Sequence, residues 1–155
     1  MKQEDKNLLL QDLCARLPYG VKIRIEYPFL KEEEWHPEIL YGLDLQRLCI
    51  ANTSIRLEEF KAYLFSISSM TDEQKEDLLL TVVGKEGLKL FSVTKDGIIS
   101  NNKAEQSFEN FSLNSINFSN KNIEAYIEWL NKKHFDYRGL IEKGLAIDCT
   151  NLNIY

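Results

Sequence analysis

The side chains best suited to chemistry lie close together near the C-terminal end of the chain. They are His134, Asp136, Tyr137, Arg138, Glu142 and Lys143. A histidine beside a carboxylate and a cation could supply a general base, its orienting group and an anion-binding residue. The competing interpretation is structural: Asp136 caps a short helix over residues 137–142, Arg138 pairs with Glu142, and Gly144 ends the helix. We favour the structural interpretation, followed by partner binding and then by catalysis through His134 and Asp136.

A second candidate site is the segment of residues 28–38, which holds two prolines, an acidic run, Trp35 and His36. An exposed tryptophan can anchor a partner protein, because large aromatic side chains dominate the binding energy of many interfaces. The alternative is that these aromatic residues fold back and cover the edge of the core. His36 has no suitably spaced neighbour of ligand type, so no metal is expected.

The cysteines give no further site. Cys14, Cys49 and Cys149 are widely spaced and form no CxxC pair, which is typical of reduced packing residues. Cys14 falls on or beside the apolar side of a predicted helix, where a buried thiol is unreactive. The chain also lacks a P-loop, a dinucleotide-binding motif and the HExxH pair of zinc proteases. We therefore expect no cofactor, and these observations favour a protein that is not an enzyme without excluding one.

The charge of the chain limits its partners. Its net charge is −5, and the basic residues are scattered among acidic ones. No direct binding to nucleic acid is expected, because a phosphate backbone attracts clustered cations. Acidic residues gather at 32–34, 58–59 and 72–77, which leaves open an inhibitor that imitates nucleic acid. The sequence contains no apolar run of about 18 residues and no secretory signal, so we expect a cytoplasmic protein without a membrane contact.

The elements that must position these residues predict an α+β fold. Apolar spacings of three and four indicate a helix over residues 4–17, and the alternation of residues 21–27 indicates a strand. Residues 39–50 are expected to be extended, whereas residues 55–65 fit a helix or a strand. The loop over about 100–120 is rich in asparagine and serine.

The second half of the chain gives clearer signals. Thr71 and Gln74 form a capping box that begins a helix over residues 72–83, which Gly84 ends. Residues 88–93 and 98–100 are expected to form a hairpin, and a third helix begins at residue 119 or 120. We predict a small antiparallel or mixed sheet packed by about three helices, plus a short C-terminal helix. Residues 1–155 are expected to form one domain with a loose tail from about residue 148.

Several ordered stretches of sequence are similar to a known group of proteins. They are residues 13–21, 60–64, 68–71, 129–131, 134–141 and 143–146. With these motifs, the chain resembles from about residue 8 to 148 a family of small uncharacterised proteins of gut Bacteroidales and their phages and prophages. Relatives look to have proline at the positions of Ala62 and Ser66, and this resemblance implies that residues 55–65 form a strand. It implies no activity, ligand or catalytic residue.

The function that fits these observations best is that of a non-enzymatic accessory or interaction protein associated with mobile elements. Its expected partner is another macromolecule, most simply a protein, bound through residues 134–143 or 28–38. The candidate binding residues are Trp35, His36, His134, Asp136, Tyr137 and Arg138. The alternatives are a small enzyme that uses His134 and Asp136, and an acidic inhibitor of a DNA-binding protein.

Overall fold

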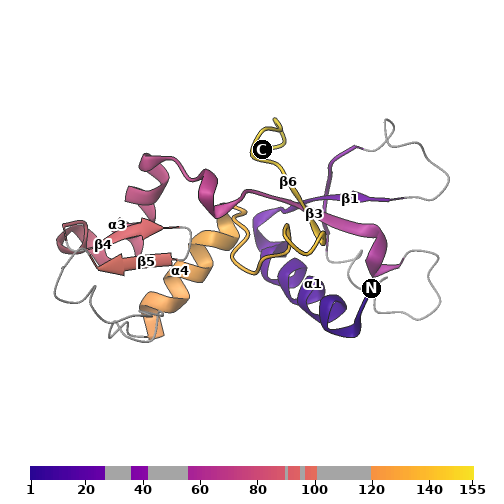
Figure 1. Cartoon of the computed structure of the whole chain (residues 1–155), viewed down its shortest axis with the longest axis horizontal. Coiled ribbons are helices and arrows are strands. Elements are labelled where there is room, and N and C mark those ends of the chain that lie inside the picture. The colour runs from indigo at the N-terminus through magenta and orange to yellow at the C-terminus, as the bar shows by residue number, and fades with distance from the viewer. Residues whose placement is uncertain (27–35, 42–55, 90, 95–96, 101–119) are drawn as a thin grey trace. The chain divides into compact units, whose positions relative to one another are not determined.

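The computed structural model describes residues 1–26, 36–41, 56–89, 91–94, 97–100 and 120–155 (Figure 1). Contacts divide the chain into two compact units, which we describe separately. The first unit comprises Met1–Ser66 and Asn131–Tyr155, and the second comprises Ile67–Leu130. Both contain helices and strands, so the predicted α+β class is confirmed. No helix in the described part of the chain combines the length and the apolar composition that a membrane crossing requires.

The first unit begins with helix α1 (Gln3–Arg16), which runs directly into a 3-10 turn (Leu17–Tyr19). Pro18 fits the start of that turn because its fixed φ suits a first helical position. Gly20 then takes a φ of 65°, a conformation that glycine adopts without a steric penalty. The predicted helix and its end are therefore confirmed.

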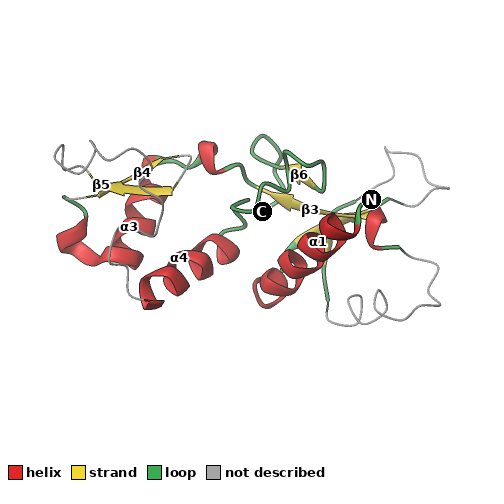
Figure 2. Ribbon diagram, turned by 60° about the horizontal axis from the view of Figure 1, so that its bottom comes forward, coloured by secondary structure: helices red, strands yellow, loops and turns green. Residues whose placement is uncertain are grey.

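A four-stranded mixed sheet packs against α1 (Figure 2). Its strands are β1 (Lys22–Ile25), β2 (Glu38–Ile39), β3 (Phe60–Leu64) and β6 (Ala146–Asp148), in the order β2-β1-β3-β6. Strand β1 is antiparallel to both neighbours, whereas β3 and β6 are parallel. The implied strand over residues 55–65 is confirmed as β3, which follows a 3-10 turn (Leu57–Glu59).

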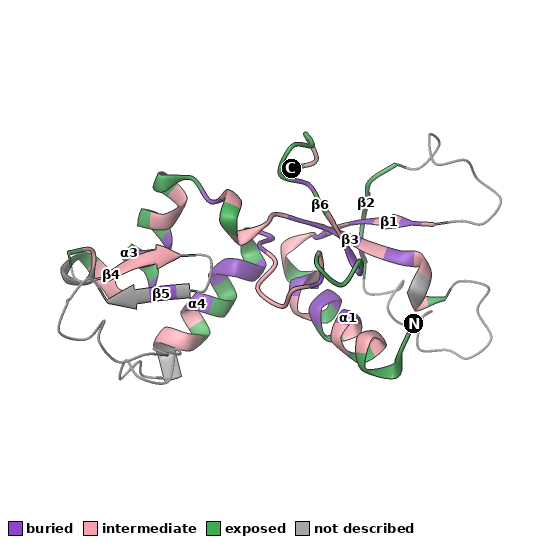
Figure 3. Cartoon of the chain, viewed as in Figure 1, coloured by how far each residue is buried: buried purple, intermediate pink, exposed green. Residues whose placement is uncertain are grey.

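The core of this unit lies between α1 and one face of the sheet. Alternate residues of β1 and β3 are buried there together with Leu9 and Leu13 of α1, as expected when successive strand residues point to opposite faces. Figure 3 shows the same alternation of buried and half-buried residues along β1. Burial of these apolar side chains is the main force that holds the unit together.

The second unit contains a hairpin and two long helices. After a 3-10 turn (Ile67–Ser69), helix α3 (Asp72–Gly87) leads to β4 (Phe91–Thr94), β5 (Gly97–Ser100) and α4 (Asn120–Lys132), whose last two residues belong to the first unit. The side chain of Trp129 donates a 2.9 Å hydrogen bond to Asp77 Oδ2, and Asn122 donates to the carbonyl of Val82. Both bonds fix α4 against α3.

Two predictions are wrong, and several others concern residues outside the described ranges. Residues 137–142, predicted as a short helix, form turns instead, because Gly139 takes a φ of 70° and interrupts a right-handed helical path. Cys14, predicted to be buried, is exposed, because it lies beside the buried stripe of α1 rather than on it. Residues 28–35 and 100–120 lie almost wholly outside the described residues, as does most of the extended segment 39–50.

Candidate functional site

Asp136 organises the predicted polar segment. One carboxylate oxygen, Oδ1, accepts from the amides of Arg138 at 3.2 Å and Leu140 at 3.0 Å, and Oδ2 accepts from the amide of Ile141 at 2.8 Å. Asparagine would keep only one of the two acceptor oxygens. Asp136 is therefore occupied in holding a loop, as the structural interpretation predicts, although it caps turns rather than a helix.

The end of this loop has the predicted geometry. Gly144 has a φ of 68°, its amide donates to the carbonyl of Ile141 at 3.0 Å, and the amide of Leu145 donates to the carbonyl of Leu140 at 2.9 Å. These two bonds are the pair that defines a Schellman motif. Leu140 and Leu145 both join the core, so the loop is anchored there at its middle and at its C-terminal end.

Arg138 and Tyr137 belong to a network built on α1. Arg16 Nε lies 2.7 Å from Asp12 Oδ2, and both side chains are fully buried. Arg16 Nη2 also donates to the carbonyl of Phe135 at 2.8 Å. Arg138 Nε lies 3.4 Å from Asp12 Oδ1, so this arginine pairs with Asp12 and not with Glu142.

The ring of Tyr137 completes the network. The guanidinium of Arg16 lies 5.5 Å from the ring centroid and that of Arg138 lies 5.1 Å from it, both within the range of a cation–π contact. Arg138 Nε also donates to the Tyr137 hydroxyl at 3.1 Å. Arg16 and Arg138 are thus both engaged with groups of the same chain, and they connect residues 135–138 to α1.

His134 lies in a separate buried cluster. Its ring stacks on Tyr155 with centroids 4.2 Å apart and an interplanar angle of 13°. The Tyr155 hydroxyl accepts from the amide of Lys22 at 2.9 Å and donates to the carbonyl of Tyr63 at 3.0 Å. The last residues are therefore tied to the sheet, in contrast to the loose tail that the sequence suggested.

The electrostatics of this cluster keep the imidazole neutral. Burial, with the nearby charges of Arg16 and Lys22, lowers the pKa of His134 to about 4. Burial also raises the pKa of the Tyr155 hydroxyl well above its usual value. His134 Nδ1 is buried and has no hydrogen-bond partner among the described residues. Asp136 consequently does not orient His134, and the two residues do not form a general-base pair here.

Of the two remaining candidate residues, the structure describes His36 but not Trp35. His36 is exposed and lies just before β2, whereas Trp35 lies outside the described residues. The structure thus brings Tyr137 and Arg138 together, places His134 apart from them, and does not place His36 with either group. In the described ranges, no three His, Cys, Asp or Glu side chains are grouped to hold a metal ion.

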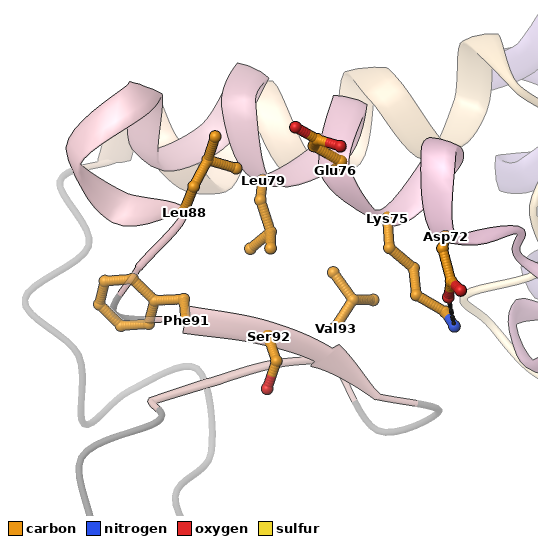
Figure 4. Close-up of a pocket in the computed structure, with 8 residues that line it drawn as sticks. All are labelled: Asp72, Lys75, Glu76, Leu79, Leu88, Phe91, Ser92 and Val93. Carbon is orange, nitrogen blue, oxygen red and sulfur yellow. Dashed lines mark hydrogen bonds and ion pairs between the residues drawn. The ribbon is translucent and has the colours of Figure 1, made fainter.

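The second unit contains a hollow between α3 and β4, which we call the α3–β4 groove. Its volume is about 300 Å³, and its apolar lining comprises Leu79, Leu88, Phe91 and Val93. Leu79 and Val93 point toward one another across it (Figure 4). Leu88, Phe91 and Val93 are only half-buried, so the groove exposes apolar side chains to solvent.

Three charged residues lie along the helical side of the α3–β4 groove: Asp72, Lys75 and Glu76. Lys75 Nζ lies 2.9 Å from Asp72 Oδ1, and this hydrogen bond lowers the pKa of the Asp72 carboxyl. Glu76 is exposed and makes no ion pair with a described residue. The groove therefore carries an excess of negative charge.

Two local features hold the helical side in place. The Thr71 hydroxyl accepts from the amide of Gln74 at 3.2 Å, and the Gln74 side chain accepts from the amide of Thr71 at 2.9 Å, which confirms the predicted capping box. Gly84 has a φ of 70° and a ψ of −178°. It interrupts the helical path where the sequence predicted the end of the helix, and one further turn then leads to Leu88.

Sequence reasoning missed the α3–β4 groove. The spacing of apolar residues identifies α3 and β4 separately, but it does not tell which of their side chains remain uncovered after packing. A signal was present in the acidic residues 72–77, for which the sequence left open an imitation of nucleic acid. Only the cap at Thr71 was recognised as the start of this region.

Comparison with known proteins identifies no relative. No protein-family model, curated protein or solved structure matches the chain. The resemblance to small proteins of Bacteroidales and their phages stays a prediction.

Proposed function

We propose that this chain is a cytoplasmic, non-enzymatic interaction protein whose α3–β4 groove binds a segment of a partner protein. The observation that carries the proposal is the lining of the groove: half-buried apolar side chains beside a carboxylate that has no ion pair with any residue the structure describes. Such surfaces are typical of interfaces, where one anchoring side chain enters an apolar pocket with a polar rim.

The size of the α3–β4 groove supports a protein ligand over a small molecule. Its volume of about 300 Å³ is at the lower limit of cavities that enclose drug-sized ligands. It suits one or two side chains of a longer segment whose remaining residues lie on the surrounding surface. The resemblance to phage and prophage proteins would make the chain an accessory protein of mobile elements.

The enzyme alternative has less support. Asp136 accepts three amide hydrogen bonds, and His134 has a pKa of about 4 within a stacked, buried cluster. A general base that works near neutral pH needs a pKa closer to 7 and access to its substrate. No observation on the described residues favours an imitation of nucleic acid over ordinary protein binding.

The proposal can be tested with a displayed library of random twelve-residue peptides selected on the full chain. We expect selected peptides to shift the amide NMR signals of residues 72–79 and 88–93. Val93→Thr keeps the branched shape of the side chain but places a hydroxyl in the groove, and it should weaken binding about tenfold, the cost of roughly one lost apolar contact.

The matched control is Leu80→Thr. Leu80 is exposed on α3 and does not line the groove, so this variant should bind the peptides as the wild type does. Equal weakening by both substitutions would show that helix stability, not the groove, determines binding. A library that yields no binder, or only binders whose NMR shifts map elsewhere, would contradict the proposed function.

A further inference from the structure

The α3–β4 groove follows the edge of a strand. Three consecutive residues of β4 line it, Phe91, Ser92 and Val93, although successive strand side chains point to opposite faces of a sheet. Figure 4 shows Val93 directed toward α3 and the Ser92 side chain directed away from it. Ser92 thus meets the hollow through its main chain, and the backbone of β4 forms part of the wall.

The hairpin register determines which backbone groups are available at that edge. Thr94 pairs with Gly97 and Val93 with Ile98. The pair that closes a hairpin across two residues exchanges both of its hydrogen bonds, and such pairs alternate with pairs that exchange none. The amide and carbonyl of Val93 are therefore directed away from β5. Among the described residues this sheet has two strands only, so no other described strand lies beside Val93 on that edge.

The charge along the groove restricts which side chains a bound segment can place there. Lys75 is engaged by Asp72 at 2.9 Å, whereas the exposed Glu76 has no ion pair in the described part of the chain. An incoming lysine or arginine would meet an unpaired carboxylate there. An incoming acidic residue would be repelled, since like charges at close range oppose binding.

We propose that the occupant of the α3–β4 groove is an extended segment of a partner protein that adds as a strand to the outer edge of β4. Its central apolar side chain lies between Leu79 and Val93, and a lysine or arginine of the segment lies beside Glu76. This inference rests on the proposed function and specifies the partner of the same site. Strand addition obtains affinity from main-chain hydrogen bonds and specificity from alternate side chains.

A helical occupant fits these observations less well. A docked amphipathic helix presents anchors over several turns and needs a long apolar groove. The lining here has four apolar residues around about 300 Å³, and the amide and carbonyl of Val93 are directed away from β5. An extended segment uses both features, because it pairs with Val93 and inserts one side chain.

The test uses the peptides selected on the full chain, made synthetically. We expect them to share a large apolar residue with lysine or arginine close by. Replacing the basic residues by glutamate should weaken binding at least fivefold. N-methylation of an amide that faces β4 should abolish binding, whereas N-methylation of the next amide along the peptide, which faces solvent, should leave it unchanged.

A matched pair of protein variants isolates the charge. Glu76→Gln should reduce the preference for basic over neutral peptides about two- to fivefold, as expected for an exposed ion pair. Glu73→Gln, on the same helix but outside the groove, should not change it. Peptides that shift the groove signals but tolerate every N-methylation, or that prefer acidic residues, would overturn strand addition while leaving the proposed function intact. Absence of any groove-directed peptide would instead overturn the proposed function.

Discussion

Two regions of this protein differ in how they use their polar groups. The segment of residues 134–138 holds the densest set of chemically capable side chains, yet Asp136, Tyr137 and Arg138 are engaged with backbone amides or with α1. The α3–β4 groove is lined by polar and apolar residues, and it leaves Glu76 without an ion pair among the described residues and most of its apolar side chains half-buried. A concentration of reactive residue types is therefore a weaker sign of a site than groups whose interactions remain unsatisfied.

The largest expected effect of a substitution concerns the first of these regions. Arg16→Ala should lower the free energy of unfolding by about 3–5 kcal/mol, because the buried Asp12 carboxylate loses its 2.7 Å partner and keeps only the longer 3.4 Å contact with Arg138. Urea denaturation followed by circular dichroism measures the change. Lys61→Ala is the control, since the Lys61–Glu26 pair is partly exposed and should contribute at most about 1 kcal/mol.

A double variant distinguishes two causes of the lost stability, namely an unpaired buried charge and lost packing. The double replacement Asp12→Leu with Arg16→Met removes both charges and keeps apolar volume, so it should cost much less than Arg16→Ala alone. If the single substitution changes stability by less than the error of the measurement, residues 134–138 are not fixed to α1 as the structure indicates. They would then become candidates for binding again.

The next effect is a dependence of stability on pH through His134. Its pKa is about 4 in the folded protein, against about 6.5 in an unfolded chain. The unfolded state therefore binds more protons between these values, and stability is lost as the pH falls from about 6.5 to about 4. The loss should amount to about 3 kcal/mol at pH 4.

Comparison with variants isolates this contribution from that of other titrating groups. His134→Asn is suitable because asparagine tolerates the positive φ of 60° at this position. Its stability should fall less steeply with pH than that of the wild type. Parallel curves for the two proteins would mean that His134 is not held neutral by its surroundings.

What the sequence predicts well is what depends on neighbouring residues. The capping box at Thr71 and Gln74, the bonds around Gly144 and the alternation in β1 all span a few positions, and the structure contains each of them. For residues 55–65, periodicity fitted a helix or a strand, and only the resemblance predicted the strand that is β3. The turns at residues 137–142 were mistaken for a helix because three amides within five residues bind one carboxylate, an arrangement that local propensity does not encode.

The remaining features depend on distant contacts. Arg16 binds the carbonyl of Phe135 across 119 positions of sequence, so no local pattern links α1 to the C-terminal loop. The α3–β4 groove exists because Leu79 of α3 and Val93 of β4 face one another without filling the space between the two elements (Figure 4). Sequence periodicity identifies a face as apolar, but the fit of two faces depends on side-chain packing in three dimensions.

The smallest expected effect links helix stability to the α3–β4 groove. Thr71→Ala removes the side-chain oxygen that accepts from the amide of Gln74 at 3.2 Å, and loss of such a cap costs about 1 kcal/mol. Thr71→Ser keeps the oxygen, so it should change the free energy of unfolding by only about 0.3 kcal/mol. Asp72, Lys75 and Glu76 lie in the first two turns of α3. Fraying of these turns should therefore also weaken the binding of the selected peptides modestly. Denaturation and peptide titration on both variants measure the two effects together.

A loss of peptide affinity in Thr71→Ser without a loss of stability would show that Thr71 contacts the ligand itself. Unchanged stability in Thr71→Ala would instead show that the first turn of α3 does not depend on its cap.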